Sequence, residues 1–175
     1  MTERFATTPF GGARMSASRF RLQEQVERRR AALTEGANDT GRAEKWPLIR
    51  ALSEARGAYG LSDRTIAVLE ALLSFHPGRE IDGAGPLIVF PSNAELSLRS
   101  RGMADATLRR HLAALVEAGL ILRRDSPNGK RYCRRDGHGE VESAFGFDLS
   151  PLALAAAGIF AAAEEARAHA RACQR

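Results

Sequence analysis

Between Arg99 and Arg135 the sequence concentrates basic side chains that could bind an anion. Ten arginines and lysines stand there against three acids, Asp105, Glu117 and Asp125, which leaves a surplus of seven positive charges; the whole chain of 175 residues carries only +5. A solvated surface usually interleaves the two signs, so a surplus confined to one segment is typical of a nucleic-acid footprint. Guanidinium groups bind phosphate oxygens and, through two hydrogen bonds, guanine.

The helix predicted over residues 104–118 would surround one long cation with small side chains. At about 100° per residue, Leu108, Leu112, Leu115 and Val116 fall on one side and form the core stripe. The small side chains on the other side permit close approach to a major groove, where an arginine can read guanine. An ordinary exposed helix with a chance arginine would look the same, and the neighbouring segments favour DNA. The candidate DNA-binding residues are Ala106, Thr107 and Arg110 on the far side, flanked by Arg109 and His111.

A shorter helix and a tight turn must position that helix. Ser92 and Glu95 have the S-x-x-E spacing of a capping box, which marks the start of a helix. Gly102 stands where a helix-ending left-handed residue belongs. Two helices joined by such a turn form a helix-turn-helix. Three more candidate DNA-binding residues lie at its ends, namely Ser92, Asn93 and Arg101.

An arginine-rich hairpin is predicted after the second helix. Residues 120–122 predict a strand, Asn128-Gly129 suits the positive φ angles of a type I′ turn, and residues 131–135 would return as the partner strand. A hairpin beside a helix-turn-helix with cations near its tip is a wing, which would grip the DNA backbone or enter the minor groove. Its candidate DNA-binding residues are Arg123, Arg124, Asn128, Lys130, Arg131 and Arg134.

The expected fold class is mainly α with a small β wing, a winged helix-turn-helix. Residues 1–44 are expected to form a flexible basic N-terminal tail with one weak helical stripe. Residues 45–150 would form the winged-helix DNA-binding domain. Residues 151–175 would form an Ala-rich C-terminal helix, leading to a C-terminal domain that this chain lacks. Other expected elements are helices near 46–57 and 62–76, a loop over 79–86, and strands over 87–90 and 144–149.

The sequence offers little for catalysis or for a membrane. No run approaches the ~18 apolar residues of a spanning helix, and the start lacks the apolar core of a secretory signal. Cys133 and Cys173 are read as reduced thiols of a cytoplasmic protein. No nucleotide-binding or metal-binding motif is present, and Tyr59 and Tyr132 lack the close histidine pair of a nickase. We therefore expect no enzyme, no cofactor, no metal and no small-molecule substrate.

Five blocks of sequence resemble a known family in order. They are WPLIRALSEAR, GLSDRTIAVLEALLSFHP, PSNAELSLRSRGM, ATLRRHLAALVEAGLILRRDSPNGKRY and AFGFDLSPL. Together they are similar to the N-terminal part of RepC, the replication initiator of repABC plasmids of alphaproteobacteria, over roughly residues 46–153. A single helix-turn-helix block would match many regulators, whereas SDRTIAVLEALLSFHP with RRDSPNGKR is far more restrictive.

The resemblance implies a winged-helix protein that binds double-stranded DNA at its plasmid's origin and helps begin copying. In that family the origin lies within the initiator's own coding region, and antisense RNA limits its production. Relatives tend to carry Ser at the position of Ala104. This chain therefore lacks a good cap for the helix predicted over residues 104–118, which lowers its stability by about 1 kcal/mol. Family members have a further C-terminal domain, without which we expect DNA binding but not the later steps.

Two other functions remain open at this point. A winged-helix transcriptional regulator would share the helix and the wing but bind promoters, and the helix after Ser150 could serve for self-association. A winged-helix interaction module would never touch DNA, and its affinity for DNA would change little when the wing cations are removed.

Overall fold

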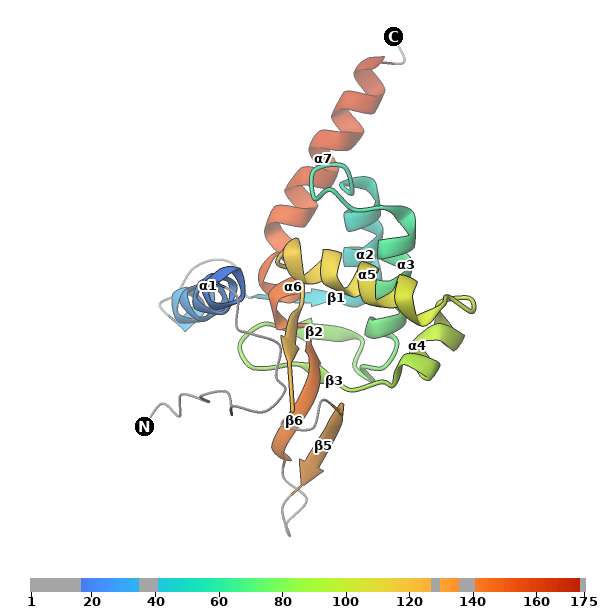
Figure 1. Cartoon of the computed structure of the whole chain (residues 1–175). Coiled ribbons are helices and arrows are strands. Elements are labelled where there is room, and N and C mark those ends of the chain that lie inside the picture. Colours follow the sequence, from blue (N-terminus) through green and yellow to red (C-terminus); the bar gives the residue numbers. More distant parts are fainter. Residues whose placement is uncertain (1–16, 35–40, 127–129, 136–140, 174–175) are drawn as a thin grey trace.

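The chain is mainly helical with two small antiparallel sheets, as the sequence predicted at this level. The computed structural model describes residues 17–34, 41–126, 130–135 and 141–173 (Figure 1). Its helices are α1 (Ala17–Thr34), α2 (Lys45–Glu54), α3 (Asp63–Leu73), α4 (Asn93–Arg99), α5 (Asp105–Glu117), α6 (Ser150–Leu154) and α7 (Ala156–Cys173). Its strands are β1 (Arg42–Glu44), β2 (Glu80–Asp82), β3 (Ile88–Val89), β4 (Leu122–Arg124), β5 (Tyr132–Arg135) and β6 (Val141–Asp148).

One continuous apolar core joins the helices to the larger sheet. The predicted stripe of α5 is buried, with Leu108, Leu112 and Leu115 at most 4% exposed, while Val116 is half-buried at its edge. Phe147 of β6 is the largest fully buried side chain. Since burial of apolar area is the main stabilising term in folding, this stripe fixes which face of α5 turns outward.

The predicted starts of α3 and α4 are confirmed. The Ser62 hydroxyl accepts from the Thr65 N–H at the start of α3. The capping box of α4 is complete, because the Glu95 N–H donates to Ser92 Oγ at 3.2 Å and the Ser92 N–H donates to Glu95 Oε2 at 2.7 Å. These bonds from Ser92 lower the pKa of Glu95. Ala104, at the start of α5, has no side chain that can cap.

The turn between α4 and α5 passes through two left-handed residues. Gly102 has a φ of 72°, as predicted, and Arg101 before it has a φ of 59°. The Gly102 N–H donates to the Ser97 carbonyl at 2.8 Å and so satisfies an open end of α4. A residue other than glycine is disfavoured in this conformation. The tight turn between α4 and α5 therefore holds the backbone of Arg101 in a strained conformation.

The larger sheet differs from the predicted hairpin. Its order is β3-β6-β4, and all pairs are antiparallel. The predicted hairpin paired residues 120–122 with residues 131–135. In the structure β4 and β5 each pair with β6 instead, β5 in register Tyr132↔Phe145. The prediction was wrong because β6 is eight residues long and pairs with three other strands. A favourable turn sequence does not determine which of the available strand edges a returning strand joins.

Two segments outside the predicted helix-turn-helix have regular structure. Residues 80–82 lie in the expected loop but form β2, which pairs with β1 in register Arg42↔Asp82, an ion pair of 2.8 Å. Helix α1 contains the weak helical stripe predicted within residues 1–44, packs against α6 and buries Val26 to 4% exposure (Figure 1).

The Ala-rich helix α7 has two different halves. Ile159 and Ala163 are buried, and the first half packs against α2, so it belongs to the core. The exposed Glu164 begins a second half that projects from the body (Figure 1). Arg167 pairs with Glu54 at the point where the helix leaves. None of the described helices is both long and apolar enough to cross a bilayer.

Candidate nucleic-acid interface

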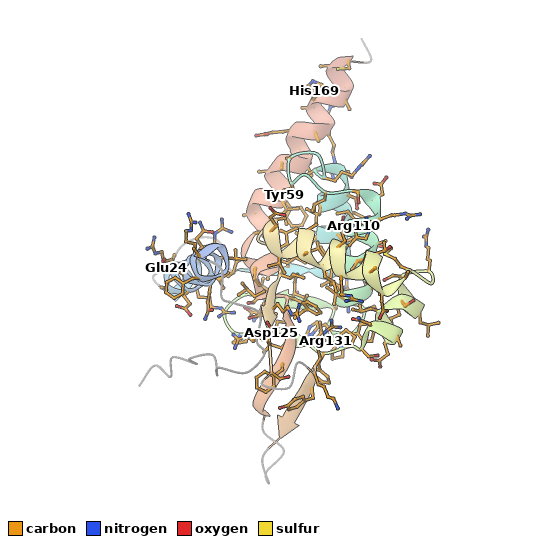
Figure 2. The ribbon with its side chains drawn as sticks, viewed as in Figure 1. Glu24, Tyr59, Arg110, Asp125, Arg131 and His169 are labelled. Carbon is orange, nitrogen blue, oxygen red and sulfur yellow. The ribbon has the colours of Figure 1, made fainter. Side chains whose placement is uncertain are left out.

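The outward face of α5 carries small side chains around Arg110, as the stripe predicted. Ala106, Arg109, Arg110 and Ala113 are exposed, and Thr107 is half-buried. Arg109 makes a weak bond of 3.4 Å to the Asp105 carbonyl one turn earlier. Within the described part of the chain, no hydrogen bond or ion pair engages the guanidinium of Arg110, which lies in the middle of the helix (Figure 2). Its donors therefore point to solvent.

Two further arginines extend this face. Arg101 is exposed in the turn before α5, and none of the described side chains bonds to it. Arg64 is exposed in the first turn of α3 and lies close enough to His111 to influence its titration, as Arg110 does. Arg64 was not among the residues predicted from the sequence, because only the packing of α3 on α5 brings it close to His111.

His111 lies on the inner face of α5 and not on the predicted flank of the DNA-binding face. It is 9% exposed, and its Nδ1 shares a hydrogen bond of 2.9 Å with Thr65 Oγ1 of α3. Burial is the main cause that lowers its pKa, and Arg110 and Arg64 add to the effect. A neutral, enclosed imidazole fastens α5 to α3 and cannot reach a DNA groove.

The predicted residues at the ends of α4 have local partners. Ser92 and Glu95 complete the capping box, and Ser92 stays exposed. Asn93 is half-buried, and its Nδ2 donates to Asp105 Oδ2 at 3.4 Å, which ties the start of α4 to the start of α5. Its Oδ1 is buried and bonds to none of the described groups. Arg99 stacks on Phe75 at 3.7 Å and donates to Ser74.

The arginines of β4 are held by carboxylates of the protein itself. Arg123 Nε lies 2.5 Å from Asp125 Oδ1. Arg124 Nη2 lies 3.4 Å from Asp148 Oδ2, and its side chain is 39% exposed. Both residues were predicted to contact DNA, and in this structure both have internal partners.

Arg131 is even more deeply engaged than the arginines of β4. Its guanidinium lies over the ring of Phe147 at 4.6 Å and donates to the Pro91 carbonyl at 2.8 Å. Burial lowers its pKa. The expectation of a cation exposed at the wing tip is wrong for Arg131, because the ring and the carbonyl draw it onto the base of the sheet.

The remaining wing residues are described only in part. Lys130 is exposed, and its carbonyl accepts from Ser126 Oγ at 2.5 Å, which closes this end of the loop. Asn128 lies outside the described residues. Arg134 is described in its backbone alone, which pairs with Ser143.

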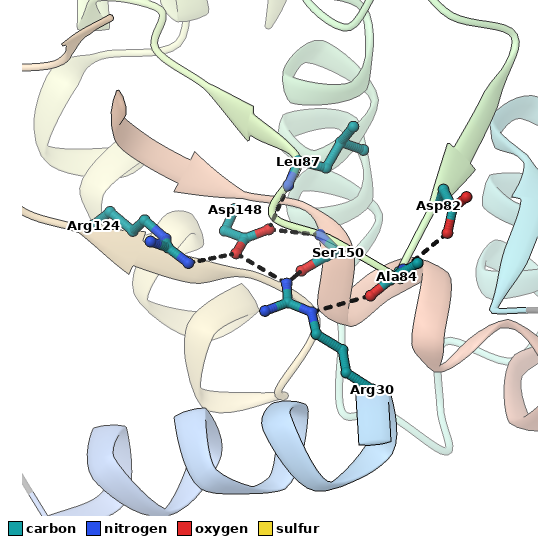
Figure 3. Close-up of polar contacts among 8 residues, drawn as sticks. Arg30, Asp82, Ala84, Leu87, Arg124, Asp148 and Ser150 are labelled. Carbon is teal, nitrogen blue, oxygen red and sulfur yellow. Dashed lines mark hydrogen bonds and ion pairs between the residues drawn. The ribbon is translucent and has the colours of Figure 1, made fainter. Parts of the chain in front are cut away.

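Asp148 is the polar centre at the end of β6, which is the base of the predicted wing (Figure 3). Its side chain is 0% exposed. Oδ1 accepts from the backbone N–H groups of Leu87 and Ser150, both at 3.0 Å. Oδ2 faces Arg124 at 3.4 Å and Arg30 of α1 at 3.5 Å. The sequence held one signal of this centre, a lone acid in the apolar run AFGFDLSPL, since a buried carboxylate needs partners.

The two tyrosines considered as nucleophiles have other surroundings. Tyr132 packs its ring on Phe145, with centroids 5.2 Å apart. Tyr59 is half-buried, and burial raises its pKa, which disfavours the phenolate. What the described side chains assemble is a group of exposed arginines on α5, α3 and the α4–α5 turn.

This fold and this surface define a small helical protein with a cation-bearing outer helix beside an antiparallel sheet. A family model described as the Replication protein C N-terminal domain matches residues 19–175. A replication protein C of Rhizobium rhizogenes is 53% identical over 146 residues, which are 83% of this chain and 34% of that protein. One of Sinorhizobium fredii is 49% identical over 152 residues, 87% of this chain and 36% of that protein.

The chain belongs to the replication protein C family, as its sequence blocks indicated. It spans about a third of the length of these relatives. No solved structure matches it.

Proposed function

We propose that this chain is the DNA-binding part of a plasmid replication initiator. It binds double-stranded DNA at the origin by placing α5 in the major groove. Membership of the replication protein C family supports the role in replication. The observation that supports the mode of binding is the unengaged guanidinium of Arg110 among the small side chains of α5.

The arrangement of elements supports a winged helix. The helix pair α4–α5 lies between β3 and β4 in the sequence, and β6 lies between β3 and β4 in the sheet. The capped start of α4 and the left-handed turn before α5 are typical of a helix-turn-helix. In such motifs the second helix enters the major groove with the first lying across the backbone.

In this proposal α5 and the hairpin have different roles in binding DNA. Arg110 reads a base pair, and Arg64, Arg101, Arg109 and Lys130 neutralise phosphates. The arginines at the base of the hairpin orient it against α5 and contribute less charge to the DNA than their number suggests, because Arg123 and Arg131 already have internal partners. Four phosphate contacts from these side chains would give a slope of log affinity against log salt of about −3.6.

Fluorescence anisotropy with duplex fragments that tile the parent replicon tests the proposal. We expect tight binding to fragments from the initiator's own coding region, and a 5- to 150-fold loss for Arg110→Ala, which corresponds to roughly 1–3 kcal/mol. Arg171→Ala is the matched control, since it removes one exposed charge near the end of α7. Binding confined to promoter fragments would favour a transcriptional regulator, and no binding to any fragment would refute the proposal.

We further propose that the chain acts by binding alone, without catalysis or a cofactor, in the cytoplasm. Self-association would have to use the exposed second half of α7, because Ile159 and Ala163 of the first half are buried in the core. Analytical ultracentrifugation of the chain with and without duplex DNA tests this point, and a monomer in both conditions would exclude self-association through α7.

A further inference from the structure

The proposed mode of DNA binding assigns no role to the contact between Arg30 of α1 and Asp148 of β6. Arg30 leaves α1 and enters the site around Asp148, where its side chain is 19% exposed (Figure 3). Its Nε donates to the Gly83 carbonyl at 3.0 Å, and its Nη2 donates to Ser150 Oγ and faces Asp148 Oδ2 at 3.5 Å. Arg30 thus contacts two segments that are far from it in the sequence, one at Gly83 and one at Asp148 and Ser150.

The carboxylate of Asp148 has two cations on the same oxygen. Arg30 approaches Oδ2 from α1, and Arg124 approaches it from β4. The carboxylate itself is fully buried, so it needs at least one positive partner to remain charged at little cost. Arg30 is mostly enclosed and makes two other bonds, whereas Arg124 is 39% exposed. Arg124 is therefore the cation that can leave.

We propose that Arg30 is a positioning residue for DNA binding, which neutralises Asp148 and so leaves Arg124 able to turn outward to a phosphate, in addition to the four phosphate contacts proposed above. The inference rests on the proposed function, and it adds α1 to the elements that determine the charge presented to DNA. When Arg30 is absent, Asp148 keeps Arg124 as its sole cation, and the exchange of Arg124 from carboxylate to phosphate becomes unfavourable.

The first test measures the salt dependence of duplex binding for charge variants of Arg30. Arg30→Gln can still donate hydrogen bonds but carries no charge, and we expect its slope to be shallower than that of the parent by about 0.9, the loss of one phosphate contact. Arg30→Lys keeps the charge beside Asp148 and should restore the slope. Arg28→Gln is the matched control, because Arg28 is an exposed cation of α1 paired with Glu24, and its slope should equal the parent's.

A double variant separates positioning from direct contact. Arg124→Ala alone should flatten the slope by the same 0.9, and Arg30→Gln added to Arg124→Ala should change it no further, since both act through one phosphate contact. An additive loss would mean that Arg30 meets DNA itself, and an unchanged slope for Arg30→Gln would mean that it only stabilises the fold. Either result overturns the inference.

A second measurement needs no DNA and keeps the inference testable if the proposed function fails. Modification of Arg124 by phenylglyoxal, followed by mass spectrometry, reports how often its guanidinium is released. We expect Arg124 to react several-fold more slowly in Arg30→Gln than in the parent or in Arg28→Gln. Equal or faster reaction would overturn the inference, whereas a parent chain that binds no duplex would overturn only the function.

Discussion

The outer face of α5 and the base of the wing are both rich in arginine, yet they use it differently. Arg110 of α5 bonds to none of the described groups, and Arg109 makes only a weak bond within its own helix. At the base of the wing, Arg124 faces Asp148 and Arg131 stacks on Phe147 and donates to Pro91. A local excess of cations therefore does not mean that all of them are available to a ligand.

The difference follows from what surrounds each element. Small neighbours on α5 offer an arginine no acceptor, whereas the sheet offers a buried carboxylate, a free carbonyl and an aromatic face. Charged side chains near such groups are drawn inward because each unsatisfied buried acceptor costs free energy. The wing is thus stabilised by residues whose type alone suggested contact with DNA.

The largest expected effect is that of removing the charge at the base of the wing. Asp148→Asn should lower the free energy of unfolding by about 3 kcal/mol, because the mostly enclosed Arg30 and the partly exposed Arg124 both lose their carboxylate partner. Urea denaturation measures it. Asp63→Asn is the control, since Asp63 is 83% exposed in its pair with Arg56 and should cost less than about 1 kcal/mol. Equal losses in the two variants would remove the distinction between the regions.

Replacing one arginine in each of the two regions gives the next largest effect. Arg131→Ala should cost about 1–2 kcal/mol of stability, from the lost stacking on Phe147 and the lost bond to Pro91. Arg110→Ala should change stability by less than about 0.5 kcal/mol, as is usual for exposed positions. Both are measured by chemical denaturation in the absence of DNA. A stability loss for Arg110→Ala as large as that for Arg131→Ala would contradict the comparison.

A smaller effect is expected at the start of α5. Ala104 has the extended backbone of a cap residue, with φ −64° and ψ 148°, but no side chain to accept a hydrogen bond. Ala104→Ser should therefore raise stability by about 1 kcal/mol. Ala106→Ser, inside the same helical turn, is the control and should lower stability slightly, since serine is a weaker helix former than alanine. Thermal melting compares the three proteins.

The smallest effect concerns the attachment of α5 to α3 and depends on pH. The pKa of His111 is lowered in the folded chain, so the unfolded chain binds its proton more readily. The stability that the neutral ring provides is complete above the unfolded pKa of about 6.5 and declines as the pH falls below it. The melting temperature should fall between pH 7.5 and pH 5.5 by more in the parent than in His111→Gln, and equal falls would show that the ring does not titrate as described.

Local patterns in the sequence predicted much of the helix pair. The stripe of Leu108, Leu112 and Leu115, the capping box at Ser92 and the turn at Gly102 each depend on residues a few positions apart. His111 was misplaced even though three residues correspond to about 300°, which puts it only about 60° from Leu108 and beside the core stripe. Its partner Thr65 lies on another helix, and no local pattern reveals it.

The features that the sequence did not predict depend on partners far apart in the chain. Arg30 and Asp148 are separated by 118 positions. The pairing of β5 with β6 instead of β4 depended on a choice among strand edges that similar local patterns allow. The surplus of basic residues predicts an anion-binding segment, but only the folded arrangement determines which cations the protein has already neutralised.

The second half of α7 extends from the body in a direction that is set by the packing of the first half. Its root is fixed on α2 by Ile159 and Ala163, and its ten residues from Glu164 to Cys173 continue as helix beyond the body. At 1.5 Å and 100° per residue, that extension spans about 15 Å. In a longer chain that continues this helix, each added residue would rotate whatever follows by about 100°, so four added residues would leave it about 40° from its original direction.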